Sequence, residues 1–127
     1  MPTSRRARGT LGRVDSGASG ELTPVAARDL IGPDAILLDV REDHEWAAGH
    51  APQATHMPMS RIPQLAVRLP ADKTIICVCH VGARSAAVAA ALNQAGWTAR
   101  NLAGGMAAWA AAGLPVVSSA GNPGVIV

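Results

Sequence analysis

Residues 74–85 read TIICVCHVGARS and are the most informative stretch for the fold. Residues 74–79 form a short continuous apolar run, which is typical of a strand buried on both faces of a sheet. A loop containing Gly82 follows, and the alanine-rich segment 85–95 has the composition of a helix that ends at Gly96. The stretch therefore predicts a buried strand, a short loop and a helix in immediate succession.

The rest of the chain repeats this alternation of buried strands and helices. Residues 35–40 (AILLDV) form a second buried run, and residues 97–102 are a third strand candidate. Apolar spacing and flanking Gly or Pro residues predict further helices over 24–31, 42–48, 60–69 and 106–112. Thr23 and Ser60 are the predicted N-caps of the first and third of these helices. Strands that alternate with helices indicate an α/β fold with a parallel sheet.

Length and composition limit the class of protein. The chain has 127 residues, of which 49% are hydrophobic, enough for the core of one folded domain and too many for a disordered protein. The longest apolar runs are shorter than the roughly 20 residues of a membrane-spanning helix. Three Trp, with no Phe or Tyr, leave little for stacking nucleic-acid bases. We expect no nucleic-acid and no membrane partner.

Charge separates the N-terminal residues from the rest of the chain. Residues 1–20 contain four Arg and one Asp, whereas the remaining residues are nearly neutral. We predict a flexible tail over 1–20, although an Arg- and Ser-rich, acid-poor start is also typical of organellar transit peptides. The predicted domain spans 21–118, and 119–127 is a predicted C-terminal tail. Two closely spaced cysteines do not form a disulfide scaffold, so we expect reduced thiols and a cytoplasmic location.

The loop 79–85 combines the groups that activate a thiol. Cys79 lies at the carboxyl end of its predicted strand, where the N–H groups and positive dipole end of the next helix favour a thiolate. Gly82 allows successive backbone N–H groups to converge on an anion, and Arg84 adds a permanent positive charge. A cysteine in an apolar run is often only a small buried hydrophobe. The glycine, the arginine and the helix start together favour a nucleophile at Cys79.

Four stretches resemble the single-domain rhodaneses, a family of sulfurtransferases. They are LLDVREDHEW (37–46), GHAPQATHMP (49–58), CHVGARS (79–85) and LAGGMAAWAAAGLPV (102–116). Their order and spacing agree with the family. The resemblance implies a small rhodanese-like fold, with a central parallel sheet flanked by helices on both faces.

The resemblance also implies a reaction and its residues. Cys79 would carry sulfane sulfur as a persulfide, taken from thiosulfate or a persulfide donor and passed to cyanide or a thiol. Donor and persulfide would be bound by the loop residues His80, Val81, Gly82, Ala83, Arg84 and Ser85. Asp39 and Arg41 would support the site as a structural ion pair. A partner protein in a sulfur relay is a further expected acceptor.

Two other functions fit the same fold. A thiolate phosphatase or arsenate reductase would use the same cysteine, but related phosphatases have five residues between Cys and Arg, whereas four separate Cys79 from Arg84. A non-catalytic interaction module would not need the intact cysteine.

Cys77, Trp46 and Trp109 are predicted to be structural. Cys77 lies two residues before Cys79, so the two side chains point to the same side of the strand and Cys77 could act as a resolving cysteine. We expect it instead to pack in the core, because buried structural cysteines are generally inert. One residue between Cys77 and Cys79 does not match zinc-ligand spacing, so no metal or other cofactor is predicted. Trp46 and Trp109 are predicted core residues.

Overall fold

The computed structural model describes residues 20–127, so most of the predicted N-terminal tail lies outside the described residues. The strands are β2 (Glu21–Leu22), β3 (Ala35–Asp39), β4 (Thr55–His56), β5 (Thr74–Val78) and β6 (Thr98–Leu102). The α-helices are α1 (Pro24–Leu30), α2 (Asp43–Ala48), α3 (Ile62–Leu65), α4 (Ala83–Gln94) and α5 (Gly105–Ala111). The strands form one sheet in the order β2-β6-β5-β3-β4.

Strand β5 lies at the centre of this sheet and pairs with a parallel neighbour on each side. Cys77 lies opposite Leu38 of β3 and opposite Asn101 of β6. The outer pairs, β2 with β6 and β3 with β4, are also parallel. The predicted α/β fold with a parallel sheet is confirmed. The carboxyl ends of these strands meet at one edge, where ligand sites of parallel sheets open.

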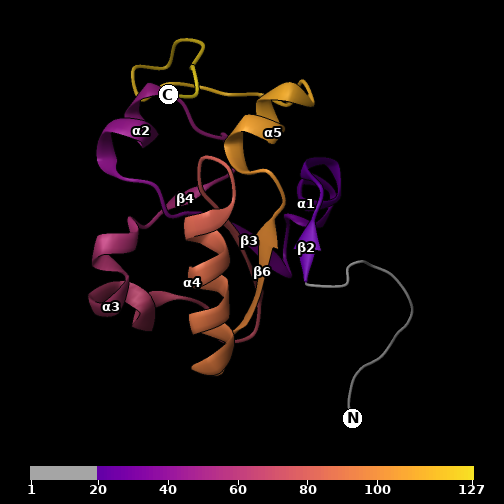
Figure 1. The fold of residues 1–127 in the computed structure, drawn as a ribbon, viewed down its shortest axis with the longest axis vertical. Coiled ribbons are helices and arrows are strands. Elements are labelled where there is room, and N and C mark those ends of the chain that lie inside the picture. Colours follow the sequence, from indigo (N-terminus) through magenta and orange to yellow (C-terminus); the bar gives the residue numbers. More distant parts are fainter. Residues whose placement is uncertain (1–19) are drawn as a thin grey trace.

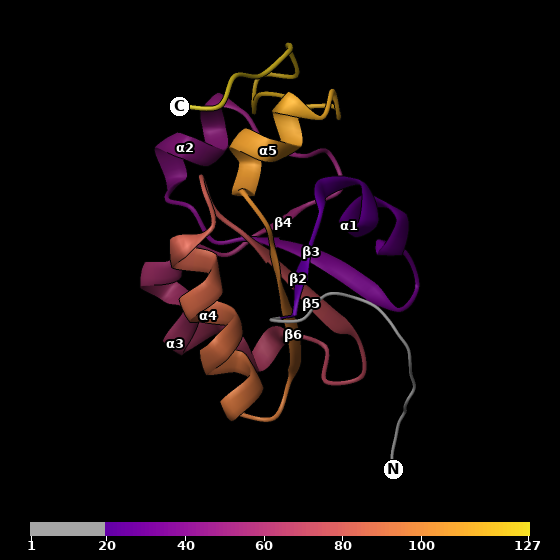
Figure 2. The ribbon, with the colours of Figure 1, turned by 45° about the vertical axis from the view of Figure 1, so that its right-hand side comes forward.

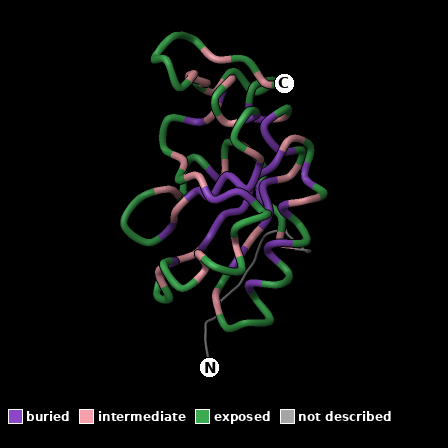
Figure 3. The backbone as a smooth tube through the Cα atoms, turned by 90° about the vertical axis from the view of Figure 1, so that its left-hand side faces the viewer, coloured by how far each residue is buried: buried purple, intermediate pink, exposed green. Residues whose placement is uncertain are grey.

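Two hydrophobic cores cover the two faces of the sheet. Because side chains alternate along a strand, β5 contributes Ile75 and Cys77 to one core and Ile76 and Val78 to the other. The first core packs against α3 and α4, and the second packs against α1 and α5 (Figure 2). Figure 3 shows the buried residues gathered along the central strands. Helices flank both faces, as the resemblance implied.

Several element boundaries differ from those predicted. Helix α4 begins at Ala83, two residues before the predicted start at Ser85, so Ser85 lies in its first turn. Ser60 is not an N-cap, because it lies within a 3-10 turn and its hydroxyl donates to Glu42 Oε1 at 2.9 Å. The helix predicted over 60–69 is divided because Pro63 has no backbone N–H and fits only the first turn of α3.

The short strands β2 and β4 are absent from the sequence prediction. Each has two residues, which is too few for a period-2 pattern to be recognised. Strand β2 forms by pairing with β6, and β4 forms by pairing with β3. Tertiary pairing therefore defines both edges of the sheet.

The two predicted core tryptophans have different environments. Trp109 is fully buried, and its Nε1–H donates to the Pro115 carbonyl at 2.9 Å. Trp46 is only half-buried, so its prediction as a core residue was wrong. Its ring stacks with those of His50 and His56, with ring centroids 3.6 and 4.6 Å away. Helix α2 is too short for its sequence to define a buried face.

The C-terminal segment folds back beside α2 (Figure 1). The predicted C-terminal tail, 119–127, makes backbone hydrogen bonds from Ser119 N–H to the Ala47 carbonyl and from Val125 N–H to the Ala48 carbonyl. Ile126 packs against the second core. Within residues 20–127, no helix is long and apolar enough to cross a bilayer.

Replacing Trp109 should destabilise the fold far more than replacing Trp46. We expect Trp109→Ala to lower the free energy of unfolding by about 3–5 kcal/mol, because it empties a fully buried site. Trp46→Ala should cost less, since its ring is partly exposed and its main contacts are two imidazoles. Urea denaturation of both variants provides the comparison. Equal losses would contradict the assignment of Trp109 to the core.

Candidate active site

The sulfur of Cys79 lies inside the loop between β5 and α4. The residue is buried, and Sγ accepts hydrogen bonds from Gly82 N–H at 3.1 Å and from the Ser85 hydroxyl at 3.2 Å. Gly82 has a φ of 115°, a left-handed conformation that side chains rarely adopt. This conformation turns the chain into α4 and directs the Gly82 N–H back to the sulfur. The loop therefore encloses the sulfur with hydrogen-bond donors.

These donors favour the thiolate form of Cys79. Burial raises the pKa of the thiol, because an apolar environment penalises charge. Hydrogen bonds to the sulfur from the Ser85 hydroxyl and from three backbone N–H groups lower the pKa and outweigh burial. The backbone donors belong to Gly82, Arg84 and Ser85. The pKa of Cys79 is therefore below its ordinary value, as expected for a nucleophilic cysteine.

The guanidinium of Arg84 forms an ion pair with the carboxylate of Glu45, which lies on helix α2. Its two terminal nitrogens donate to Glu45 Oε1 and Oε2, each at 2.8 Å, in a bidentate pair. The hydrogen bond with Arg84 lowers the pKa of Glu45 from 4.5 to about 2, against the effect of burial. The pair joins α2 to the first turn of α4. The sequence pattern includes Glu45, but only the fold shows that it binds Arg84.

The other predicted binding residues lie on the outside of the loop. Val81 and Ala83 are exposed, and His80 is half-buried. The carbonyls of Cys79 and His80 accept from the N–H groups of Met106 and Ala107 at 2.7 and 3.0 Å. Helix α5 therefore holds the inner side of the loop while its outer side faces solvent.

Asp39, the last residue of β3, forms a buried ion pair with Arg41. Arg41 Nη2 lies 2.8 Å from Asp39 Oδ2 and donates to the Gly49 carbonyl at 2.7 Å. Asp39 also accepts from the Arg41 backbone N–H at 3.0 Å. Both side chains are fully buried. The pair joins the end of β3 to the end of α2.

Cys77 is a thiol within the first hydrophobic core. It is fully buried, and burial raises its pKa to about 12. Among residues 20–127, no group of three His, Cys, Asp or Glu side chains could hold a metal ion.

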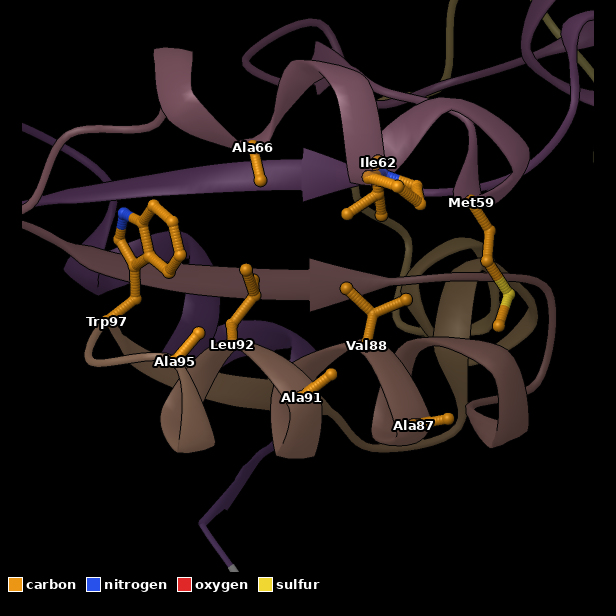
Figure 4. Close-up of a pocket in the computed structure, with 10 residues that line it drawn as sticks. Met59, Ile62, Ala66, Ala87, Val88, Ala91, Leu92, Ala95 and Trp97 are labelled. Carbon is orange, nitrogen blue, oxygen red and sulfur yellow. The ribbon is translucent and has the colours of Figure 1, made fainter.

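An apolar groove of about 330 Å³ runs between α3 and α4 (Figure 4). Met59 and Ile62 line one side, and Val88, Leu92 and Trp97 line the other. None of the loop residues 79–85 is among its lining residues. The groove is therefore separate from the sulfur of Cys79.

Comparison with known proteins identifies the family. A family model described as a rhodanese-like domain matches residues 23–112, a range that includes α1 through α5 and the whole loop 79–85. The chain belongs to the rhodanese-like domain family. The family resemblance of the sequence is thereby confirmed.

Relatives of this rhodanese-like domain include sulfurtransferases. A sulfurtransferase of Allochromatium vinosum is 40% identical over 89 residues, which cover 69% of this chain and 83% of that protein. A thiosulfate sulfurtransferase of Actinobacillus succinogenes is 31% identical over 103 residues, covering 80% and 93% of the two chains. The crystal structure of a rhodanese-related protein from Thermoplasma volcanium has a TM-score of 0.71 at 30% identity, covering 76% and 96%.

Gly105 permits the close approach of α5 to the active-site loop of this rhodanese-like domain. Its φ is 63°, and a Cβ there would overlap the carbonyl oxygens of Cys79 and His80. We expect this overlap to lower the free energy of unfolding of Gly105→Ala by about 1–3 kcal/mol. The strain of an alanine at positive φ lowers it further. The displaced loop should also raise the pKa of Cys79, as measured by alkylation rate against pH.

Gly113→Ala is the matched control for Gly105→Ala. Gly113 also has a positive φ, 79°, but a Cβ there would meet nothing within 4 Å. In Gly113→Ala, the strain of positive φ alone should lower the free energy of unfolding, by about 1–2 kcal/mol. The pKa of Cys79 should stay unchanged. If both variants behaved alike, Gly105 would not hold the loop.

The Glu45–Arg84 pair predicts a loss of stability in acid. Because folding lowers the pKa of Glu45 from 4.5 to about 2, its contribution is present above pH 4.5 and disappears as the pH falls towards 2. We expect Glu45→Gln to be less stable near neutral pH and to show a smaller decrease over this window. Denaturant titrations at successive pH values provide the measurement. Asp29→Asn, which breaks an exposed pair with Arg28, should keep the wild-type pH dependence.

Proposed function

We propose that this rhodanese-like domain is a sulfurtransferase that carries sulfane sulfur as a persulfide on Cys79. The observation that supports this proposal most directly is the sulfur of Cys79 itself. It accepts hydrogen bonds from Gly82 N–H and the Ser85 hydroxyl, and its pKa is below the ordinary value. A buried thiolate surrounded by donors is suited to attack a sulfur atom in an anionic donor.

In the first half-reaction, the Cys79 thiolate attacks the outer sulfur of thiosulfate or the sulfane sulfur of a persulfide. A new S–S bond forms on Cys79, the donor S–S bond breaks, and sulfite or a thiolate leaves with the bonding electron pair. In the second half-reaction, cyanide or a thiolate attacks the outer sulfur. Thiocyanate or a new persulfide then leaves, and the Cys79 thiolate is restored.

The loop residues have distinct proposed roles in this cycle. Backbone N–H groups of residues 80–84 and the Ser85 side chain would stabilise the donor and the persulfide. Arg84 would fix the first turn of α4, because its guanidinium is already bound to Glu45. His80 and Val81, at the outer surface, would contact the donor or acceptor. Asp39 and Arg41 would support the site without touching substrate.

Loop length supports sulfur transfer over phosphate hydrolysis. Four residues separate Cys79 from Arg84, one fewer than in the related phosphatases. The shorter loop leaves space for one more sulfur atom rather than a tetrahedral phosphate.

Both cysteines are free, which is consistent with the reducing environment of the cytoplasm. The acceptor would be a small thiol or a partner protein in a sulfur relay.

Mass spectrometry of the intact protein tests the persulfide. After treatment with thiosulfate or cysteine persulfide, we expect wild type to gain the mass of one sulfur atom and to lose it again on adding cyanide. Cys79→Ser should not gain this mass. Cys77→Ala is the matched control and should load like wild type, because Cys77 is buried with a pKa of about 12.

Two outcomes would contradict the proposal. One is that no donor adds sulfur to wild type, and the other is that Cys79→Ser loads as well as wild type. Hydrolysis of an aryl phosphate by wild type, lost in Cys79→Ser, would then favour a phosphatase. Failure of both reactions would favour a non-catalytic interaction module.

A further inference from the structure

A buried amide lies behind the nucleophile, on the side away from the outer surface of the loop. Asn101 is on β6, only 5% exposed, and its Oδ1 lies 2.6 Å from the Ser85 hydroxyl oxygen. Its Nδ2 donates to the Gly82 carbonyl at 3.1 Å and to Glu21 Oε2 at 2.9 Å. Asn101 therefore contacts both residues that donate to the sulfur of Cys79.

The surroundings of Asn101 fix the orientation of its amide. The Gly82 carbonyl and the Glu21 carboxylate are both acceptors, so the NH₂ group must face them. Oδ1 must then face Ser85. Reversing the amide would place Oδ1 against two other oxygen atoms and leave a buried repulsion. The acceptor for Ser85 is thus held in place by two independent hydrogen bonds.

Ser85 has one hydroxyl proton and two main acceptors for it. One is Asn101 Oδ1 at 2.6 Å, and the other is Cys79 Sγ at 3.2 Å. The hydroxyl cannot donate fully to both. With a neutral Cys79 thiol, the shorter bond to Asn101 is favoured and the Ser85 oxygen can accept from S–H. With a thiolate, the negative sulfur attracts the proton more strongly.

We propose that Asn101 is a positioning residue that competes with the Cys79 sulfur for the Ser85 hydroxyl. Full donation from Ser85 to the thiolate requires the hydroxyl to leave Asn101, and this limits how strongly Ser85 stabilises the resting thiolate. When Cys79 carries a persulfide, the charge lies on the outer sulfur and the hydroxyl returns to Asn101. This inference rests on the proposed role of Cys79 as nucleophile.

Limiting the stabilisation of the thiolate by Ser85 affects how reactive Cys79 is. A thiolate becomes a weaker nucleophile as the pKa of its thiol falls. Full donation from Ser85, added to the backbone N–H groups, would stabilise the thiolate further and make it less reactive. The backbone N–H groups would favour the thiolate, and competition from Asn101 would keep the pKa from falling further, which preserves nucleophilicity.

Charged and titratable groups from several elements surround the loop. They are Cys77 on β5, Glu21 on β2, Asp39 at the end of β3, Arg41 just after it, Glu42 and Glu45 at α2, His80 in the loop and Arg84 on α4. All of them remain in the variants described below. Asn101→Ala also removes the hydrogen bond to Glu21 Oε2, so the comparison with the variant that also lacks the Ser85 hydroxyl separates the effect of Glu21 from that of Ser85.

The test is the pH dependence of Cys79 alkylation by iodoacetamide, which needs no sulfur donor. We expect Asn101→Ala to lower the thiol pKa by about half a unit, because Ser85 then donates only to sulfur. The alkylation rate at the high-pH plateau should fall by about 1.5- to 2-fold. A merely structural role for Asn101 gives the opposite sign. The Gly82 carbonyl would keep its hydrogen bond from Ala86 N–H, at 3.0 Å, but lose the one from Asn101 Nδ2. A less firmly held loop would bring fewer donors to the sulfur and raise the pKa of Cys79.

Two further variants isolate the route through Ser85. Ser85→Ala should raise the thiol pKa, and adding Asn101→Ala to it should produce no lowering. Asn93→Ala is the matched control, because Asn93 also joins α4 to β6, through the Ala99 carbonyl and N–H, without contacting the loop. It should leave the pKa unchanged. A raised or unaltered pKa in Asn101→Ala, or a lowering that persists without Ser85, would overturn the proposal.

A measurement on the wild-type protein covers the case in which Asn101→Ala does not fold. The side-chain NH₂ resonances of Asn101 should titrate with the same midpoint as Cys79 alkylation, whereas those of Asn93 should not. This titration should be absent in Cys79→Ser. If Cys79 ionises while the Asn101 resonances stay unchanged, the proposal is wrong. Because neither measurement involves sulfur transfer, failed sulfur loading would count against the proposed function alone.

Discussion

The parallel pairing of β5 on both sides is the constraint on which the site depends. With β3 and β6 fixed in register beside it, β5 has no freedom to shift, and Cys79 must emerge at the carboxyl edge of the sheet. The same register places Asn101 opposite Cys77, on the strand beside the nucleophile. A shift of one residue would exchange the two faces of β5 and remove the cysteine from its loop.

Charge around the loop is organised by two ion pairs with different roles. Asp39 and Arg41 are fully buried and link β3 to the end of α2, so they help to position that helix. Helix α2 in turn carries Glu45, which holds Arg84 in the first turn of α4. Arg84 is therefore more a structural support than a free charge beside the sulfur, and the hydrogen-bond donors around Cys79 come mainly from backbone N–H groups.

Much of the fold was predictable because its buried strands are continuous apolar runs. Strands β3 and β5 and the loop with Cys79 follow from such runs and from the Gly82 turn. The prediction was wrong where an element is too short to carry a pattern, as for Trp46 in α2. It also missed β2 and β4, whose two residues each become strands only through a neighbour.

The sequence by itself determined the fold class, the family and the identity of the candidate nucleophile, since these depend on local patterns and on spacing within one loop. Tertiary structure alone decided which distant groups complete the site. Glu45, Asn101 and Gly105 come from separate elements and contact the loop through pairing and packing that no local pattern encodes. Hydrogen bonds between such residues arise only after the sheet has set their distances.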